Sequence, residues 1–193
     1  WGRSDPDAGP WALGFVTPYA MWGWVEDSAT VDVDGDFYRR IGSGASEGRK
    51  NGTPGASGWL VTGGGNERDV RDAKLPVRIY VRWQSVVEPQ TYQGWIEIPE
   101  SARQVMRDAL TKDCPERPEL KEIRIGVSVR LGLAPGGIVQ VWALDECRRA
   151  VKVARGQAEI EPKGPDLGRS GYPPMQEASK RYIEQYGIPY GSW

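Results

Sequence analysis

The sequence predicts a mainly β protein, a β-rich α+β fold in which an antiparallel sheet or sandwich carries two packed helices. Three observations point to this class: apolar and polar residues alternate along several segments, Gly and Pro residues separate those segments, and only two segments have helical periodicity. A chain of 193 residues is long enough to bury one core. We expect a flexible, polar N-terminal tether over residues 1–10 and a single β-rich domain over residues 11–193.

The alternating segments define the strands. Their apolar residues recur at every second position, as in a sheet with one buried face. In the segment 77–83 the odd positions are apolar, so Arg78, Tyr80 and Arg82 share the other face. We expect strands at residues 14–16, 21–26, 77–83, 91–98, 123–133, 138–144 and 151–160. Residues 30–39 are expected to form a hairpin about Asp34-Gly35, and residues 134–137 a turn that joins two strands into a second hairpin.

Two segments have the periodicity of amphipathic helices. After Pro99, apolar residues follow at helical spacing over residues 102–110. A second helix is expected at about residues 174–186, before Gly187, with one stripe formed by Ala178, Tyr182 and Tyr186. No apolar run approaches the roughly 20 residues that a transmembrane helix needs.

The chain contains nine tryptophans and no histidine. Without imidazole, Ser–His and Cys–His nucleophilic sites and His-ligated metal sites are excluded. Tryptophan concentrates in protein cores and in the buried anchors of interfaces. We therefore expect a binding protein rather than an enzyme, with no cofactor and no metal. The balance of 25 basic and 26 acidic residues gives no indication of nucleic acid or of an anionic membrane as the partner.

One long segment, residues 42–66, is rich in Gly and Ser and has little periodicity. A loop of this length is either a functional segment or a disordered, simply exposed one. Trp59 within it is either a plug of a satellite core or an anchor for a protein contact. Trp83, Trp95 and Trp142 lie within predicted strands, and we expect at least two of them in the core.

The candidate partner-binding residues lie in this loop, just after it, and on one predicted strand. On that strand the guanidinium–aromatic stripe suits protein contact, although a solvated sheet face is the commoner interpretation. The candidates are Arg49, Lys50, Asn51, Trp59, Glu67, Arg68, Asp69, Arg78 and Arg82.

Two acidic features have both a structural and a functional interpretation. Asp32, Asp34 and Asp36 could converge on calcium, but no Glu follows at the required spacing, and an acidic hairpin turn is favoured. Glu88, between two tryptophan-containing strands, is the candidate acid if the protein is a glycoside hydrolase. A solvated turn glutamate is the favoured interpretation of that residue.

The two cysteines, Cys114 and Cys147, are either separate buried thiols or one disulfide. The disulfide is favoured because both residues lie at polar ends of predicted elements. It would stabilise the fold by about 3–4 kcal/mol in the chain-entropy model, and it would place the protein in an oxidising compartment.

Five segments, in order along the whole chain, carry a family resemblance. They are GFVTPYAMWGWVE (14–26), YVRWQSVVEPQTY (80–92), GLAPGGIVQVW (132–142), QAEIEPKGP (157–165) and YGIPYGSW (186–193). Together they resemble a proteobacterial family with a domain of unknown function, whose members are usually described as lipoproteins.

The resemblance implies export to the periplasm and anchoring through a lipidated cysteine upstream of the folded domain, absent from this chain. Some members resemble immunity proteins encoded beside phospholipase effectors of type VI secretion, a toxin–antitoxin arrangement. We therefore expect a non-enzymatic periplasmic immunity protein that binds and neutralises a lipase-type effector. The alternatives are an envelope carbohydrate- or peptidoglycan-binding module, and a hydrolase that relies on Glu88.

Overall fold

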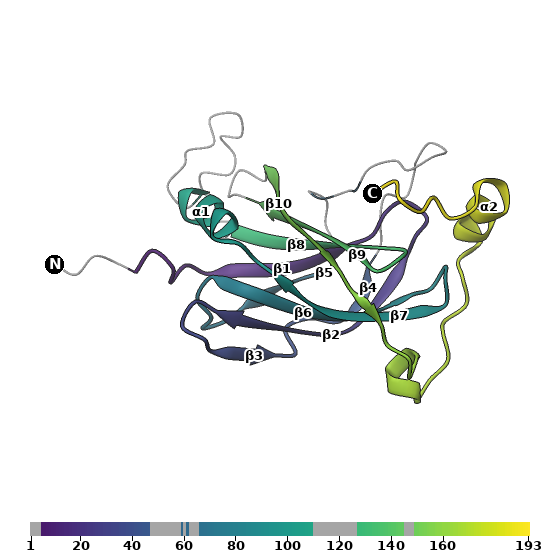
Figure 1. Ribbon diagram of the computed structural model, residues 1–193, viewed down its shortest axis with the longest axis horizontal. Coiled ribbons are helices and arrows are strands. Elements are labelled where there is room, and N and C mark those ends of the chain that lie inside the picture. Colours follow the sequence, from purple (N-terminus) through teal and green to yellow (C-terminus); the bar gives the residue numbers. More distant parts are fainter. Residues whose placement is uncertain (1–4, 47–58, 60, 62–65, 110–126, 145–148) are drawn as a thin grey trace.

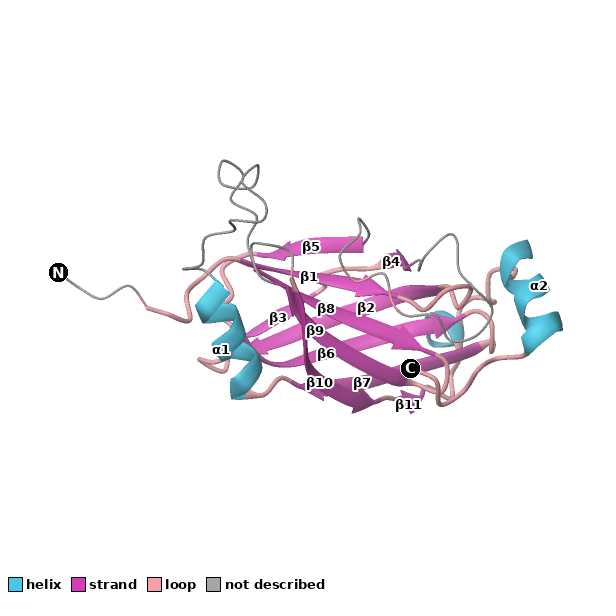
Figure 2. Cartoon of the chain, turned by 90° about the horizontal axis from the view of Figure 1, so that it is seen from above, coloured by secondary structure: helices cyan, strands magenta, loops and turns pink. Residues whose placement is uncertain are grey.

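The described strands form two sheets, stacked as the layers of a sandwich (Figures 1 and 2). The computed structural model describes residues 5–46, 59, 61, 66–109, 127–144 and 149–193. Sheet A consists of β1 (Trp11–Val16), β5 (Asn66–Val70), β8 (Val127–Ala134), β9 (Ile138–Leu144) and β10 (Ala150–Gln157). Sheet B consists of β2 (Gly23–Asp32), β3 (Phe37–Arg39), β4 (Gly44–Ser46), β6 (Pro76–Ser85), β7 (Gln90–Glu97) and β11 (Glu159–Ile160). The helices are α1 (Glu100–Ala109), the short 3₁₀ helix η2 (Pro165–Gly168) and α2 (Glu177–Tyr186).

The strand order is β10-β9-β8-β1-β5 in sheet A and β11-β7-β6-β2-β3 in sheet B, where β4 also pairs with β2. Among the described strands, β1 and β8 form the single parallel pair, with Trp11 opposite Val127. The mainly β sandwich with two helices is confirmed, and this pair is an addition to the antiparallel arrangement that we expected. It joins strands from opposite halves of the sequence, so the hairpin signals could not indicate its direction.

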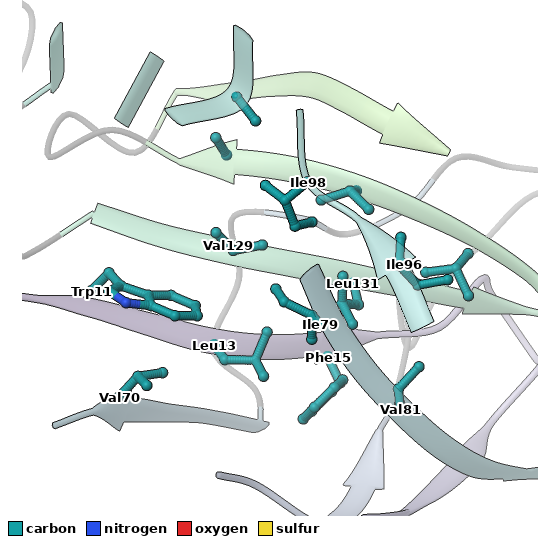
Figure 3. Packing of buried hydrophobic residues seen from close by; sticks show 14 of the residues in the cluster. Trp11, Leu13, Phe15, Val70, Ile79, Val81, Ile96, Ile98, Val129 and Leu131 are labelled. Atoms are coloured by element: carbon teal, nitrogen blue, oxygen red, sulfur yellow. The ribbon is translucent and has the colours of Figure 1, made fainter. Parts of the chain in front are cut away.

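The core lies between the sheets and is built from alternate residues of their central strands (Figure 3). β6 contributes Ile79, Val81 and Trp83, the odd positions of the predicted alternation. From sheet A they are faced by buried residues of β1 and β8, namely Trp11, Leu13, Phe15, Val127, Val129, Leu131 and Leu133. Removal of this apolar surface from water is the main stabilising contribution to the fold.

β2 is one long strand where the sequence predicted two separate segments. Its register with β6 shifts between Val25 and Asp27, so that Glu26 is the extra residue of a β-bulge. A bulge changes which residues face the core, and the apolar alternation therefore breaks in the middle of the strand. The predicted hairpin at Asp34-Gly35 is confirmed, with Gly35 at a φ of 84°.

The predicted strand 151–160 is divided between the two sheets. β10 pairs with β9 in sheet A, and β11 pairs with β7 in sheet B. Between them lies Ala158, which is buried and donates its N–H to the carbonyl of Gly137 at 2.8 Å. This corner connects the two layers at the β8–β9 turn, where Gly136 and Gly137 both have positive φ, as the predicted turn requires.

The two helices lie at opposite ends of the sandwich (Figure 1). α1 follows Pro99 and buries Ala102, Met106 and Ala109, in agreement with its predicted spacing. α2 begins later than predicted and buries Ser179 and Tyr182, whereas Ala178 and Tyr186 of the predicted stripe are exposed. Within the described residues, no helix is sufficiently long and apolar to cross a membrane.

Residues 5–10, predicted as part of the tether, are held against the domain. Lys74 Nζ lies 2.6 Å from the Asp5 carboxylate, and Arg107 lies 2.7 Å from that of Asp7. The backbone N–H of Leu75 also donates to the carbonyl of Asp7 at 3.0 Å. These contacts attach the segment to the end of the sandwich that carries α1.

Candidate binding surface on sheet B

Sheet B has one face toward the core and one face directed away from sheet A. On β6 the outward residues are Arg78, Tyr80 and Arg82, which is the stripe that the sequence predicted. Tyr80 lies opposite Ala29 of β2 on one side and opposite Trp95 of β7 on the other. Since directly opposite residues in a ladder share a face, these neighbours also point outward.

Three aromatic side chains gather on this outer face. The Trp95 ring lies 5.9 Å from the ring of Phe37 and 5.4 Å from that of Tyr80. They line an open hollow of about 350 Å³, into which the small side chain of Ala29 also faces. Trp95 is 40% exposed and Phe37 is 47% exposed. Large aromatic groups left in water at one place are typical of an interaction site.

Three arginines surround these rings. The guanidinium carbon of Arg78 lies 4.7 Å from the ring centre of Trp95, and that of Arg39 lies 5.1 Å from the ring centre of Phe37. Arg40 also lines the hollow, and it has a φ of 53°, which is unusual for a residue with a side chain. We call the six residues the aromatic–arginine surface: Phe37, Arg39, Arg40, Arg78, Tyr80 and Trp95.

None of these three arginines has a carboxylate within 4.0 Å in the part of the chain that the structure describes. Asp27 lines the same hollow, but the ion pair that it forms is with Arg82, at 4.0 Å. The aromatic–arginine surface therefore combines apolar rings with three guanidinium groups that form no ion pair with an acidic group of the described chain.

Arg82, predicted as a contact residue, belongs to an internal network. It donates to Glu26 Oε2 at 2.8 Å, while Glu26 Oε1 accepts from Gln84 at 3.0 Å and from the backbone N–H of Asp166 at 2.6 Å. Burial opposes the charge of Arg82, but hydrogen bonds to Glu26 and Tyr80 outweigh it and raise the pKa of Arg82. The network attaches η2 to sheet B and fixes the strands beside the aromatic–arginine surface.

Trp59 and Glu67, two of the predicted binding residues, form contacts on the sheet A side of the sandwich. The Trp59 ring lies 5.1 Å from that of Trp142, in a small cluster outside the main core. A Cβ at Gly132 would lie 2.5 Å from Trp142, so glycine is needed for this ring pair. Glu67 lies 2.8 Å from the buried guanidinium of Arg130. Trp59 thus packs as a plug of a satellite core, the first of its two interpretations.

The remaining predicted residues do not gather around one site. Arg68 and Asp69 are exposed on β5, an edge strand of sheet A, and Arg78 is the candidate that belongs to the aromatic–arginine surface. Outside the described residues lie Arg49, Lys50, Asn51, Cys114 and Cys147.

Sequence reasoning missed Phe37, Arg39, Arg40 and Trp95 as members of a site. The sequence does contain a signal for Trp95. Alternate residues of a strand face the same side, so Trp95 points away from the core with Gln93 and Glu97, whereas Tyr92 and Ile96 of β7 face the core. Phe37 and the two arginines lie on or just after β3, a strand of three residues that is too short to have a readable period.

The acidic hairpin uses its first aspartate to hold the turn. Asp32 is buried, and its Oδ1 accepts from the backbone N–H groups of Asp34 and Asp36 at 3.0 and 3.1 Å. Its Oδ2 accepts from the backbone N–H of Lys74 at 3.1 Å. Both carboxylate oxygens therefore bind backbone donors, and Asp34 pairs with Lys74 instead of pointing to a shared cation. This agrees with the favoured interpretation of an acidic turn.

Replacing Asp32 with alanine is expected to lower the free energy of unfolding by about 2–3 kcal/mol, because three backbone donors lose a charged acceptor. Asp32→Asn should lose less, since its amide oxygen still accepts from two of them. Urea denaturation measures both values. An equal loss of stability in both variants would contradict the turn assignment. So would an increase in the stability of the wild-type protein on addition of calcium.

Glu88 joins three parts of the molecule. Its Oε1 accepts from the hydroxyls of Tyr92 at 2.9 Å and Tyr190 at 2.7 Å, and from the backbone N–H of Gly136 at 2.9 Å. These donors come from β7, the C-terminal segment and the β8–β9 turn. Trp95, one of the two tryptophans expected beside this acid, lies on the outer face of the sheet instead. The geometry describes a structural clamp rather than a sugar-cleft acid.

The same clamp predicts a dependence on alkaline pH. Burial, and then the hydrogen bond to Glu88, raise the pKa of Tyr190 to about 12, and they raise the pKa of Tyr92 as well. The unfolded chain releases these protons at about pH 10, so stability should fall as the pH rises from about 10 towards 12. Phenolate absorbance of the protein minus that of Tyr190→Phe isolates this residue. A difference titration centred near pH 10 would show that the clamp is absent. Glu88→Gln should lower the pKa of Tyr190 towards 10, because the charged hydrogen-bond acceptor is lost.

Comparison with known proteins gives a family and no function. A family profile described as a protein of unknown function (DUF2931) matches residues 3–191. No curated protein sequence and no solved structure matches the chain.

Proposed function

Because the chain belongs to the DUF2931 family of proteins of unknown function, we propose its role from its surface: a non-enzymatic protein that binds a partner through sheet B. The observation that carries this proposal is the aromatic–arginine surface, where Trp95 and Phe37 remain exposed beside a hollow of about 350 Å³. Aromatic and arginine side chains are the groups that most often contribute large binding energies at protein interfaces.

We propose that the partner is a lipase-type effector and that the protein acts in the periplasm as its immunity protein. The support is the whole-chain resemblance to lipoproteins of which some look like immunity proteins, together with a rigid surface suited to protein contact. A lipid anchor upstream of Trp1, and a disulfide between Cys114 and Cys147, are parts of this proposal.

A carbohydrate- or peptidoglycan-binding role is the second candidate, since an exposed tryptophan beside a hollow on a β-sandwich also suits sugar stacking. The position of Arg78 disfavours the sugar-binding role. Its guanidinium lies 4.7 Å from the Trp95 ring centre and occupies one of the two ring faces on which a sugar could stack. Saturable tryptophan quenching during a muropeptide titration would favour the sugar role.

The test begins with the genes beside that of this protein, among which we expect one that encodes a lipase-type effector. We expect the purified proteins to bind with a dissociation constant below about 1 μM in calorimetry. We also expect an equimolar amount of this protein to block hydrolysis of phospholipid vesicles by the effector. Co-expression should protect cells from the toxin. The absence of any lipase gene at the locus, or of both binding and protection, would remove the proposal.

A further inference from the structure

The guanidinium groups of the aromatic–arginine surface indicate the chemistry of the partner. Arg39 and Arg78 rest on the rings of Phe37 and Trp95 at 5.1 and 4.7 Å. One face of each of these rings is therefore occupied by a cation of the protein itself. A cationic or quaternary ammonium ligand would compete with them, whereas an anion would be attracted by the same groups.

The arginines around the hollow form no ion pair with an acidic side chain of the described residues. Glu97 lies directly opposite Arg78 in the β6–β7 ladder, yet no ion pair joins them, because Arg78 stacks on Trp95 instead. Asp27, the acidic group that lines the hollow, is engaged by Arg82. Across the described residues, Arg39, Arg40 and Arg78 thus have no carboxylate within ion-pair distance.

The backbone conformation at Arg40 also indicates that this arginine is held at the hollow. This residue has a φ of 53°, in the left-handed region where side chains are disfavoured, and its neighbour Ile41 is anchored by a hydrogen bond to Ser28. Ser28 also bonds the carbonyl and the N–H of Gly42. The chain just after β3 is therefore fixed by β2 in a conformation that brings Arg40 to the hollow.

We infer that the segment of the partner that binds here is acidic, with carboxylates that pair with Arg39, Arg40 and Arg78 and an apolar side chain that enters the hollow beside Trp95. A hollow of about 350 Å³ accommodates one such side chain, and exposed guanidiniums with parallel N–H groups match carboxylates. This inference rests on the proposed function for the identity of the partner, but not for its chemistry.

The first arm of the test uses this protein alone. The probe is the peptide acetyl-Gly-Glu-Leu-Glu-Gly-amide, and its matched control has both Glu residues replaced by Gln. NMR of the tryptophan indole N–H groups follows binding at about 20 mM and about 200 mM salt. We expect the acidic peptide to shift the Trp95 signal, with at least about tenfold weaker binding of the Gln peptide or at high salt. Equal binding of both peptides, or no shift at Trp95, would overturn the inference.

The second arm uses charge reversal. Arg39→Glu and Arg78→Glu should each abolish peptide binding, whereas Arg181→Glu, the same change on exposed α2, should not. The two sheet variants should also weaken the effector complex by about tenfold or more, with circular dichroism confirming that each is folded. Arg78→Lys keeps the charge without the planar stack and should retain part of the binding.

The outcomes separate the two proposals. Peptide binding without lipase binding removes the proposed function and keeps the acidic partner. Lipase binding that is unchanged in Arg39→Glu and Arg78→Glu keeps the proposed function and removes the acidic partner. Binding to phosphatidylglycerol vesicles that requires these arginines, without peptide binding, would overturn the inference in favour of a membrane.

Discussion

Trp83→Ala is expected to lower the free energy of unfolding by about 3–5 kcal/mol, the range for removing a large aromatic group from a packed core. Trp83 is 1% exposed, and its ring centre lies 5.3 Å from that of Tyr92. Opposite it in the ladder is Val25, which is fully buried. The cavity left by the missing indole cannot be filled without moving strands of sheet B. Urea denaturation followed by circular dichroism measures the loss.

The matched control is Trp95→Ala, the same replacement on the adjacent strand but on the opposite face of the same sheet. We expect it to change the free energy of unfolding by less than about 1 kcal/mol, because Trp95 is 40% exposed and keeps contact mainly with surface groups. A similar loss for both variants would mean that the two faces of sheet B have not been assigned correctly.

The same Trp95→Ala variant is expected to weaken the proposed complex with a lipase-type effector by about 30-fold or more, which corresponds to about 2 kcal/mol. The indole contacts three other members of the aromatic–arginine surface, the rings of Phe37 and Tyr80 and the guanidinium of Arg78. Its removal takes away apolar contact area and also releases the guanidinium from its fixed position. Calorimetry with the purified effector gives the ratio of dissociation constants.

Tyr186→Ala is the control for binding, since Tyr186 is 43% exposed and lies on α2 at one end of the sandwich (Figure 1). It should leave the dissociation constant unchanged. If instead Tyr186→Ala weakened the complex and Trp95→Ala did not, the binding surface would lie on α2 and not on sheet B.

The strands could be predicted because a two-residue period is a direct consequence of having one buried face. The alternation in β6 gave both the core residues Ile79, Val81 and Trp83 and the outward stripe. It failed where geometry departs from the regular strand. The bulge at Glu26 breaks the alternation within β2, and the corner at Ala158 transfers the chain from one sheet to the other.

The site could be predicted only in part, because it is assembled from strands that are distant in the sequence. Arg78 and Tyr80 were recognised as an outward stripe, but the ladder register decides that Trp95 of β7 is their neighbour. Phe37 belongs to β3, which is separated from β6 by β2. Trp59 shows the converse. Its place in a glycine-rich loop is compatible with exposure, and the fit above Gly132 that lets it pack on Trp142 is a tertiary property.

Hydroxyl-radical footprinting of this protein, free and in the proposed complex with a lipase-type effector, tests most directly whether sheet B is the binding surface. Oxidation reports the solvent exposure of each side chain, and the free protein exposes aromatic groups on both sheet B and α2. We predict that Trp95, Phe37 and Tyr80 become protected in the complex while Tyr186 does not. Unchanged oxidation of Trp95 and Phe37 in a saturated complex would show that the partner binds elsewhere.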